Sequence, residues 1–281
     1  MNTVAQPLQS NPWDKAAAGW NEHADLIRSW LREVTEAMLD TARIGRGARV
    51  LDIAAGAGDQ TLDIARRVGP TGHVLATDLS AGILALAGRN AQAHGYAHVH
   101  TRVADAQALE MAGANFDAAV CRLGLMFCAN PLLALVQARA ALKPAGRFSA
   151  VVFSAPQQNP CLTITMAIAR RYAGLPPATS AAPGSLLSLG QPGLLEWLLD
   201  EAGFVDITVQ AVAAPFKLPS SQHYVDFVRA AGSPIIERLA QAPQKVQSQA
   251  WNDMAVALSR FNTHSGWEGP NELLLCSGTA A

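Results

Sequence analysis

The chain has 281 residues, of which 50% are hydrophobic, and its formal net charge is −1. That size suits one elaborated α/β domain with a substantial core, so residues 1–281 are expected to form a single domain. The net charge shows no excess of basic residues, which argues against nucleic acid as a partner. No apolar run approaches the roughly 18 residues of a membrane span, and the N-terminus lacks a signal-peptide pattern, so a cytoplasmic protein is expected.

Residues 1–44 are expected to form a helical arm. Apolar side chains recur there at helical spacing before the Gly45-Arg46-Gly47 break, a pattern typical of two amphipathic helices. Trp13 and Trp20 belong to this apolar stripe, and they either line a substrate pocket or pack in the core. His23 is a candidate general base, although a single histidine is more often a packing or surface residue.

A buried strand expected at 48–53 runs directly into a glycine turn that opens a helix at 59–68. Gly56 and Gly58 allow the backbone to turn sharply and to approach a ligand closely. Ala54 precedes them, and because a residue with a Cβ is comfortable only at negative φ, we expect a negative φ there. The arrangement predicts a site for a nucleotide-like cofactor.

Two carboxylates narrow the choice of cofactor. Asp78 follows the next apolar segment, 20 residues after Gly58, where it can accept hydrogen bonds from both hydroxyls of a ribose. A nicotinamide site requires a third glycine where Thr61 stands. Asp52, inside the strand, suits a cationic amino-acid head and would repel a pyrophosphate. The sequence therefore favours S-adenosylmethionine.

Strands and helices continue to alternate, which predicts parallel strands joined by right-handed crossovers. Ligands of such sheets lie at the carboxyl ends of the strands, where Asp105 and Arg122 fall as well. The expected strands lie near 48–53, 73–77, 98–103, 117–121 and 147–153, and the expected helices near 59–68, 81–93 and 131–142.

The pattern changes beyond Phe153, where two insertions are expected. The insertion at 156–190 lies in a stretch, 154–191, that is rich in Pro, Ala, Ser and Gly. The insertion at 213–270 contains residues 221–261, which read as two or three amphipathic helices. Together with the arm, these insertions are expected to form a lid over the cofactor. A helix near 162–172, a helix near 192–202 and closing strands near 204–211 and 272–279 complete the expected elements.

Five segments in order resemble the class I S-adenosylmethionine-dependent methyltransferases, most of all the branch of the ubiquinone/menaquinone-biosynthesis enzymes. The resemblance implies a doubly wound, Rossmann-like seven-stranded sheet, mostly parallel, with a C-terminal antiparallel hairpin, helical lid elements and a cofactor-binding core at 45–155. The segments are Val-Leu-Asp-Ile-Ala-Ala-Gly-Ala-Gly (50–58), Ala-Thr-Asp-Leu-Ser (76–80), Val-Ala-Asp-Ala (103–106), Phe-Asp-Ala-Ala-Val-Cys-Arg (116–122) and Leu-Lys-Pro-Ala-Gly-Arg-Phe (142–148).

The resemblance also implies roles for single residues. Asp105 with the amide of Ala106 is similar to the family's adenine-binding pair. Arg122 stands where the family holds the cofactor ammonium with backbone carbonyls, and its side chain could pair with the cofactor carboxylate, with Asp52 or with Asp59. The full expected cofactor set is Asp52, Ala54, Gly56, Gly58, Gln60, Thr61, Asp78, Leu79, Asp105, Ala106 and Arg122.

Other residues are candidates for binding or activating the acceptor. His264, before the last strand, joins His23 as a possible base, which is needed only if the attacking group keeps its proton. No His/Asp/Glu cluster at ligand spacing occurs in the sequence, so no metal is expected. The expected substrate pocket consists of Trp13, Trp20, Met126, Phe127 and Trp267.

The sequence thus predicts methyl transfer from S-adenosylmethionine to O, N or C of a small, largely apolar or aromatic metabolite. Alternatives are a quinone-ring C-methyltransferase, a nicotinamide-dependent oxidoreductase and a non-catalytic S-adenosylmethionine-binding protein. The expected partner is a small-molecule acceptor, and the oligomeric state is left open.

Overall fold

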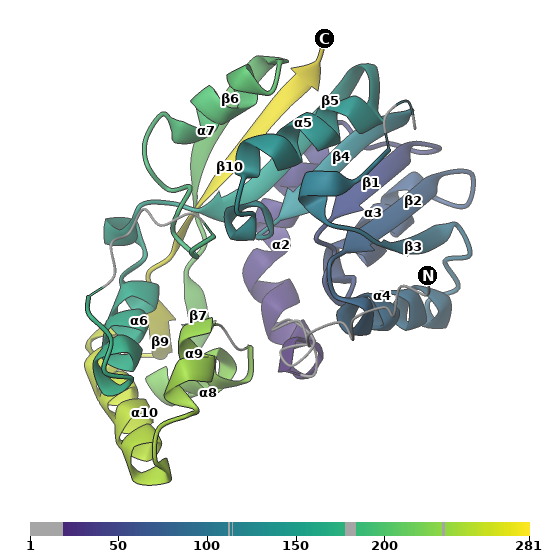
Figure 1. Cartoon of the computed structure of the whole chain (residues 1–281). Helices are drawn as coiled ribbons and strands as arrows, with labels where there is room; N and C mark the ends of the chain where they lie inside the picture. Colours follow the sequence, from purple (N-terminus) through teal and green to yellow (C-terminus); the bar gives the residue numbers. More distant parts are fainter. Residues whose placement is uncertain (1–18, 112, 114, 178–183, 232–233) are drawn as a thin grey trace, which may run out of the picture.

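The computed structural model describes residues 19–111, 113, 115–177, 184–231 and 234–281 (Figure 1). Its main sheet has seven strands in the order β3-β2-β1-β4-β5-β10-β6. The first five strands of this order pair in parallel, and β10 is antiparallel to both β5 and β6. The strands are β1 (Arg49–Ile53), β2 (His73–Asp78), β3 (Val99–Val103), β4 (Phe116–Arg122), β5 (Leu142–Phe153), β6 (Phe204–Ala213) and β10 (Glu272–Ala280).

The predicted fold class is therefore confirmed. The strand order reverses at β1, so the carboxyl ends of β1 and β4 form the crevice at which ligands of such sheets bind. α5 and α7 lie on one face of the sheet, and α2 and α3 lie on the other (Figure 1). The helices around the sheet are α2 (Ala24–Thr41), α3 (Asp59–Val68), α4 (Ala81–Ala93), α5 (Pro131–Ala141) and α7 (Leu194–Glu201).

Helix α2 belongs to the main core. Its apolar stripe is almost completely buried, since Ile27, Leu31, Val34, Met38 and Leu39 are at most 2% exposed. Burying an aliphatic side chain of this size contributes about 1.5–3 kcal/mol. Helix α2 is thus fixed by core packing, while Ala24, Ile27, Arg28, Trp30 and Leu31 on it also line the cavity described below. That the arm serves as part of a lid stays a prediction.

The lid is a second layer of structure beside the carboxyl edge of the main sheet, at the lower left of Figure 1. It contains a three-stranded antiparallel sheet that was not predicted, because strands of two to four residues are too short to show an alternating pattern. Its elements, which we call the lid, are α6 (Pro160–Tyr172), β7 (Phe216–Leu218), α8 (Ser221–Ala231), α9 (Pro234–Leu239), α10 (Gln244–Leu258), β8 (Asn262–Thr263) and β9 (Gly266–Gly269).

Trp30 of α2 joins the core to the lid. Its Nε1 donates to the carbonyl of Ala214 at 2.8 Å, and its ring stacks on Phe216 at a centroid distance of 4.0 Å. Because Phe216 opens β7, the first lid strand is held against the core helix.

None of the described helices is long and apolar enough to cross a membrane.

Two alanines adopt the left-handed conformation. Ala54 has φ 56° and Ala145 has φ 62°, so the predicted negative φ at Ala54 is wrong. The turn after β1 requires this conformation, and the facing residue leaves room for the Cβ of Ala54, because a Cβ at Gly124 would lie only 2.4 Å from it. For a residue with a Cβ, the left-handed region costs about 1–2 kcal/mol.

We expect Ala145→Gly to raise the free energy of unfolding by about 0.5–1 kcal/mol, because relief of the left-handed strain exceeds the entropy that glycine adds to the unfolded chain. Ala145 is exposed, so little packing is lost. The matched control is Ala85→Gly on the exposed side of α4, which should lower stability by about 0.5–1 kcal/mol. Urea unfolding measures both, and a destabilised Ala145→Gly would contradict the strain argument.

Candidate functional site

A cavity of about 320 Å³ lies at the carboxyl edge of the main sheet and is walled on its other side by the lid. We call its two parts the loop end and the lid end. The loop end carries the charged residues, including Asp59, Asp78, Asp105 and Arg122, beside the backbone of Ala54 and Gly56. The lid end is lined by apolar and aromatic side chains, among them Trp20, Trp30, Met166, Phe216, Tyr224 and Phe227.

The glycine turn at the loop end is compact. Gly56 has φ 58° and Gly58 has φ 89°, both in the region that favours glycine. A Cβ at Gly58 would lie 2.8 Å from the Cβ of Ala87, so glycine lets α3 begin directly against α4. Gly56 lines the cavity with its backbone, as the sequence predicted.

Asp52 is buried and faces the start of α3. Its carboxylate accepts a hydrogen bond from Gln60 Nε2 at 3.0 Å and another from Thr61 Oγ1 at 2.6 Å. Burial raises its pKa to about 6, against the effect of both hydrogen bonds. Gln60 lines the cavity, whereas Asp52 and Thr61 do not. Asp52 and Thr61 are thus bonded within the protein, and their predicted roles toward the cofactor, for Asp52 either directly or through water, stay predictions.

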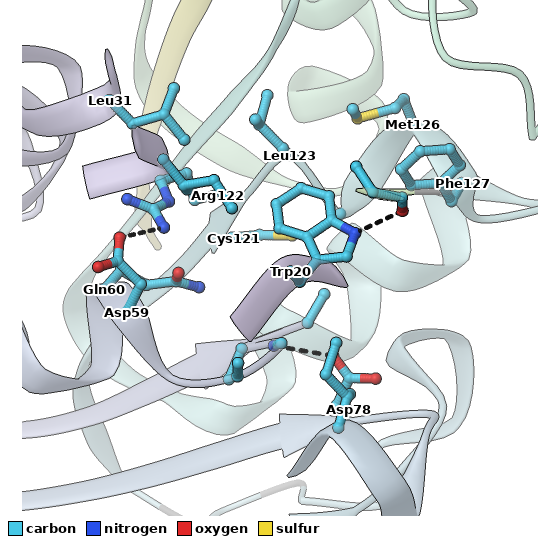
Figure 2. Close-up of a pocket in the computed structure, with 18 of the residues that line it drawn as sticks. Trp20, Leu31, Asp59, Gln60, Asp78, Cys121, Arg122, Leu123, Met126 and Phe127 are labelled. Carbon is cyan, nitrogen blue, oxygen red and sulfur yellow. Dashed lines mark hydrogen bonds and ion pairs between the residues drawn. The ribbon is translucent and has the colours of Figure 1, made fainter. Parts of the chain in front are cut away.

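Asp78 lies at the carboxyl end of β2 and lines the cavity (Figure 2). Its Oδ2 accepts from the backbone N of Gly56 at 3.0 Å, and its Oδ1 accepts from the backbone N of Ser80 at 2.9 Å. The carboxylate therefore ties the glycine turn to the start of α4. Leu79 also lines the cavity and is 55% exposed.

Asp105 and Ala106 follow β3 and line the same end. Asp105 Oδ1 accepts from the backbone N of Gln107 at 2.9 Å and from its Nε2 at 3.2 Å. Gln107, which the sequence did not single out, also lines the cavity, and its Oε1 accepts from the backbone N of Asn130 at 2.7 Å. The loops after β3 and β4 are connected through this side chain.

Arg122 is paired with Asp59, which was one of its predicted alternatives. Its guanidinium donates to Asp59 Oδ2 at 2.7 Å (Figure 2). It also donates to Thr35 Oγ1 at 2.8 Å. Arg28 of α2, missed by the sequence reasoning, donates from the other side to Asp59 Oδ1 at 3.0 Å. A single arginine on an amphipathic helix gives no signal of such a role. Asp59 is the first residue of α3, where the helix dipole favours a negative charge.

The predicted pocket residues divide into two groups. Trp20, Met126 and Phe127 line the cavity, and the Nε1 of Trp20 donates to the carbonyl of Ala231 at 2.9 Å. Trp267 does not line it and is buried inside the lid, where its Nε1 donates to the carbonyl of Leu258 at 2.7 Å. Trp13 lies outside the described residues.

Neither predicted base lies at the cavity. His23 packs its ring edge-on against Phe227 at 5.5 Å, and His264 is exposed in the turn between β8 and β9. The acidic residues among the described cavity walls, Asp59, Asp78 and Asp105, all belong to the loop end. The described part of the lid end therefore offers no carboxylate or imidazole that could accept a proton.

The site and the fold define a Rossmann-like α/β protein with a nucleotide-type loop and an apolar cover. A family model described as "Methyltransferase domain" matches residues 44–203. The chain therefore belongs to the methyltransferase domain family, and its resemblance to the class I S-adenosylmethionine-dependent methyltransferases is confirmed.

Curated relatives include the ubiquinone/menaquinone biosynthesis C-methyltransferase UbiE of Hahella chejuensis. It is 31% identical over 153 residues, which are 54% of this chain and 61% of that protein, so the chain spans less than two thirds of the relative's length.

Solved structures support the fold. The YcgJ protein of Bacillus subtilis matches with a TM-score of 0.60 at 20% identity, covering 88% of this chain and 98% of that one. Phosphoethanolamine N-methyltransferase 2 of Haemonchus contortus, in complex with S-adenosyl-L-methionine, matches with a TM-score of 0.57 at 16% identity, covering 93% of this chain and 57% of that one.

The buried Asp52 predicts a pH-dependent stability. Its pKa is about 6 in the folded protein and 3.8 ordinarily, so the folded state binds the proton more tightly. The free energy of unfolding therefore falls as the pH rises from about 4 to about 6, by about 1.4 kcal/mol for each pH unit. Asp52→Asn keeps the shape without the charge. The free energy of unfolding of Asp52→Asn, relative to that of the wild type, should therefore rise by about 2 kcal/mol between about pH 4.5 and about pH 7.5.

Urea unfolding over this pH range measures the difference. Asp117→Asn is the matched control, since a backbone hydrogen bond from Arg49 and the ammonium of Lys143 lower the pKa of Asp117. Its carboxylate stays ionised in both states over the range tested, so the control should show no such trend. A pH-independent difference between Asp52→Asn and the wild type would refute the assigned pKa.

Proposed function

We propose that the protein binds S-adenosylmethionine at the loop end and transfers its methyl group to O, N or C of a small, largely apolar or aromatic metabolite at the lid end. The observation that carries this proposal is that one cavity joins a glycine turn flanked by carboxylates to an apolar, aromatic wall. A cofactor at the loop end would present its reactive group toward the lid.

The loop end offers a partner for each part of the cofactor. In this proposal Asp78 accepts hydrogen bonds from the ribose hydroxyls, and Asp105 with the amide of Ala106 holds the adenine. The backbone of the glycine turn approaches the methionine portion, and Asp52 acts indirectly by fixing Gln60. Arg122 positions Asp59 and the residues after β4, because its guanidinium is already bonded within the protein.

Methyl transfer is an in-line displacement. A lone pair of the acceptor forms the new bond to the methyl carbon, and the electrons of the C–S bond return to sulfur, which changes from a cationic sulfonium to a neutral thioether. Since charge is not built up on the cofactor, orientation and exclusion of water can supply much of the rate. The apolar lid end suits both. With no proton acceptor on its described wall, the reaction suits an acceptor that is already ionised or unprotonated.

A nicotinamide cofactor fits less well. Thr61 stands where the nicotinamide fingerprint has a third glycine, and Asp52 places a buried carboxylate against the start of α3, where a pyrophosphate would bind. Quinone-ring C-methylation is the second candidate, and it is favoured by the curated relatives, which are ubiquinone/menaquinone biosynthesis C-methyltransferases. Much of the lid, including α8, α9 and α10, lies outside the matched residues 44–203. Because the family match does not cover these helices, we propose a class of acceptor and not a particular compound.

Ligand binding separates the cofactor classes. At about a hundred times its dissociation constant, S-adenosylhomocysteine should stabilise the protein by roughly 2.7 kcal/mol and raise the melting temperature by about 5–10 °C. NADH at the same concentration should leave the melting temperature unchanged. A shift with NADH and none with S-adenosylhomocysteine would move the chain to the oxidoreductases.

The catalytic proposal is tested by incubating the protein with methyl-labelled S-adenosylmethionine and a metabolite extract, and identifying the labelled product. Asp78→Asn should weaken S-adenosylhomocysteine binding about ten- to a hundredfold, because charge-assisted hydrogen bonds to the ribose are lost. Asp117→Asn, at the amino end of β4, should bind like the wild type. Cofactor binding without transfer to any component would favour the non-catalytic alternative.

A further inference from the structure

The amide side chain of Gln60 has one end bonded within the protein and one end open. The residue is the second of α3, lines the cavity and is 3% exposed (Figure 2). Its Nε2 donates to Asp52 Oδ1 at 3.0 Å, whereas no hydrogen bond from the described chain reaches its Oε1. Oε1 is not among the described atoms that are fully buried without a partner. The small accessible part of Gln60 therefore includes Oε1, and it faces the cavity.

Asp52 decides which end of the amide is open. An ionised carboxylate can only accept hydrogen bonds, so the Gln60 amide must turn its nitrogen toward Asp52 and its oxygen toward the cavity. A protonated Asp52 can donate from Oδ1, and the amide can then turn over and present its nitrogen instead. Thr61 Oγ1 donates to Oδ2 at 2.6 Å and holds the carboxylate in place. The charge of Asp52 thus sets whether Gln60 offers the cavity an acceptor or a donor.

The groups around Asp52 bring it close to the point of protonation. Burial raises its pKa to about 6, and the charge of Asp78, at the end of β2, acts in the same direction. The two hydrogen bonds that it accepts and the charge of Arg122, at the end of β4, lower its pKa. Burial also raises the pKa of the neighbouring Cys121 thiol well above its ordinary value, so this thiol stays neutral. The charge on this side of the cavity therefore changes with the protonation of Asp52.

We propose that Gln60 recognises the α-ammonium of the cofactor with its amide oxygen, and that Asp52 is the positioning residue that selects this orientation of the amide. The proposal rests on the proposed function, because it assigns the loop end to S-adenosylmethionine, whose amino-acid portion carries the ammonium. A hydrogen bond from an ammonium to Oε1 is charge-assisted, whereas an amide nitrogen in the same place would leave the ammonium without this partner. Cofactor binding should therefore depend on pH, although no histidine lines the described cavity.

The test compares two ligands, S-adenosylhomocysteine and its analogue in which hydrogen replaces the amino group. Their dissociation constants are measured by calorimetric titration at about pH 7 and about pH 5 for the wild type, Gln60→Met, Asp52→Asn and Asp117→Asn. Methionine keeps the length of glutamine and removes the amide. Asp117→Asn is the matched control, since Asp117 lies at the amino end of β4, does not line the cavity and has a lowered pKa. Melting temperatures are measured on the same samples.

At about pH 7, the wild type and Asp117→Asn should bind S-adenosylhomocysteine about tenfold more tightly than the analogue, or more. At about pH 5 their dissociation constant for S-adenosylhomocysteine should be about tenfold higher, because only about a tenth of Asp52 is then ionised. The constant for the analogue should not rise.

The two site variants should separate the roles. Gln60→Met should lower the preference for the amino group about tenfold and remove the pH dependence. Asp52→Asn should keep the preference and lose the pH dependence, because its amide oxygen still accepts from Gln60 Nε2 at every pH. If Gln60→Met melts too low to assay, the same substitution is made in Asp52→Asn, where no buried charge loses its partner. The double variant should then lose the preference that Asp52→Asn keeps.

The role of Gln60 would be overturned if its replacement by methionine left both the preference and the pH dependence intact, because Asp52 would then act on the ammonium directly or through water. A wild-type affinity that does not change with pH, or an Asp52→Asn variant that keeps the pH dependence, would overturn the role of Asp52. A wild type that binds S-adenosylhomocysteine at neither pH is a separate result and would refute the proposed function instead.

Discussion

The buried carboxylate of Asp52 fixes the junction between β1 and α3, and the cavity depends on that junction. The carboxylate binds the side chains of Gln60 and Thr61, while its backbone carbonyl accepts from Thr77 Oγ1 at 3.2 Å. The end of β1, the end of β2 and the first turn of α3 are therefore connected through one residue. Removing this carboxylate from water is costly, and the two hydrogen bonds offset only part of that cost.

Two residues with a strained backbone lie in the loops that follow β1 and β4. Ala54 and Leu123, which line the cavity, both have φ 56°, although neither is a glycine. Their loops are pressed together, since a Cβ at Gly124 would lie 2.4 Å from the Cβ of Ala54. Left-handed alanine and leucine persist only where the surroundings determine them, and such positions are typical of ligand sites. The protein thus uses core stability to hold two ligand-facing loops in unfavourable conformations.

The main sheet could be predicted because its strands are apolar and separated by helices with clear periodicity. The strands of the lid sheet are too short to show a pattern, so Trp267 was assigned to the substrate pocket and Phe216 was not singled out. The ion pairs could not be predicted either, because nothing in the sequence connects Arg28 with Asp59, 31 positions away. His23 and His264 were chosen by expected position alone, and that position depended on unpredicted lid geometry.

The two ends of the cavity are supplied by different parts of the chain. The glycine turn, Asp78 and Asp105 lie within the family match at 44–203, whereas α2, β7 and α8 lie outside it. Trp30 connects the outside segments to one another by stacking on Phe216, and Arg28 connects α2 to the start of α3. The loop end is thus held by hydrogen bonds that Asp52, Asp78 and Asp105 accept from donors within the matched domain, while much of the apolar lid end comes from segments outside it.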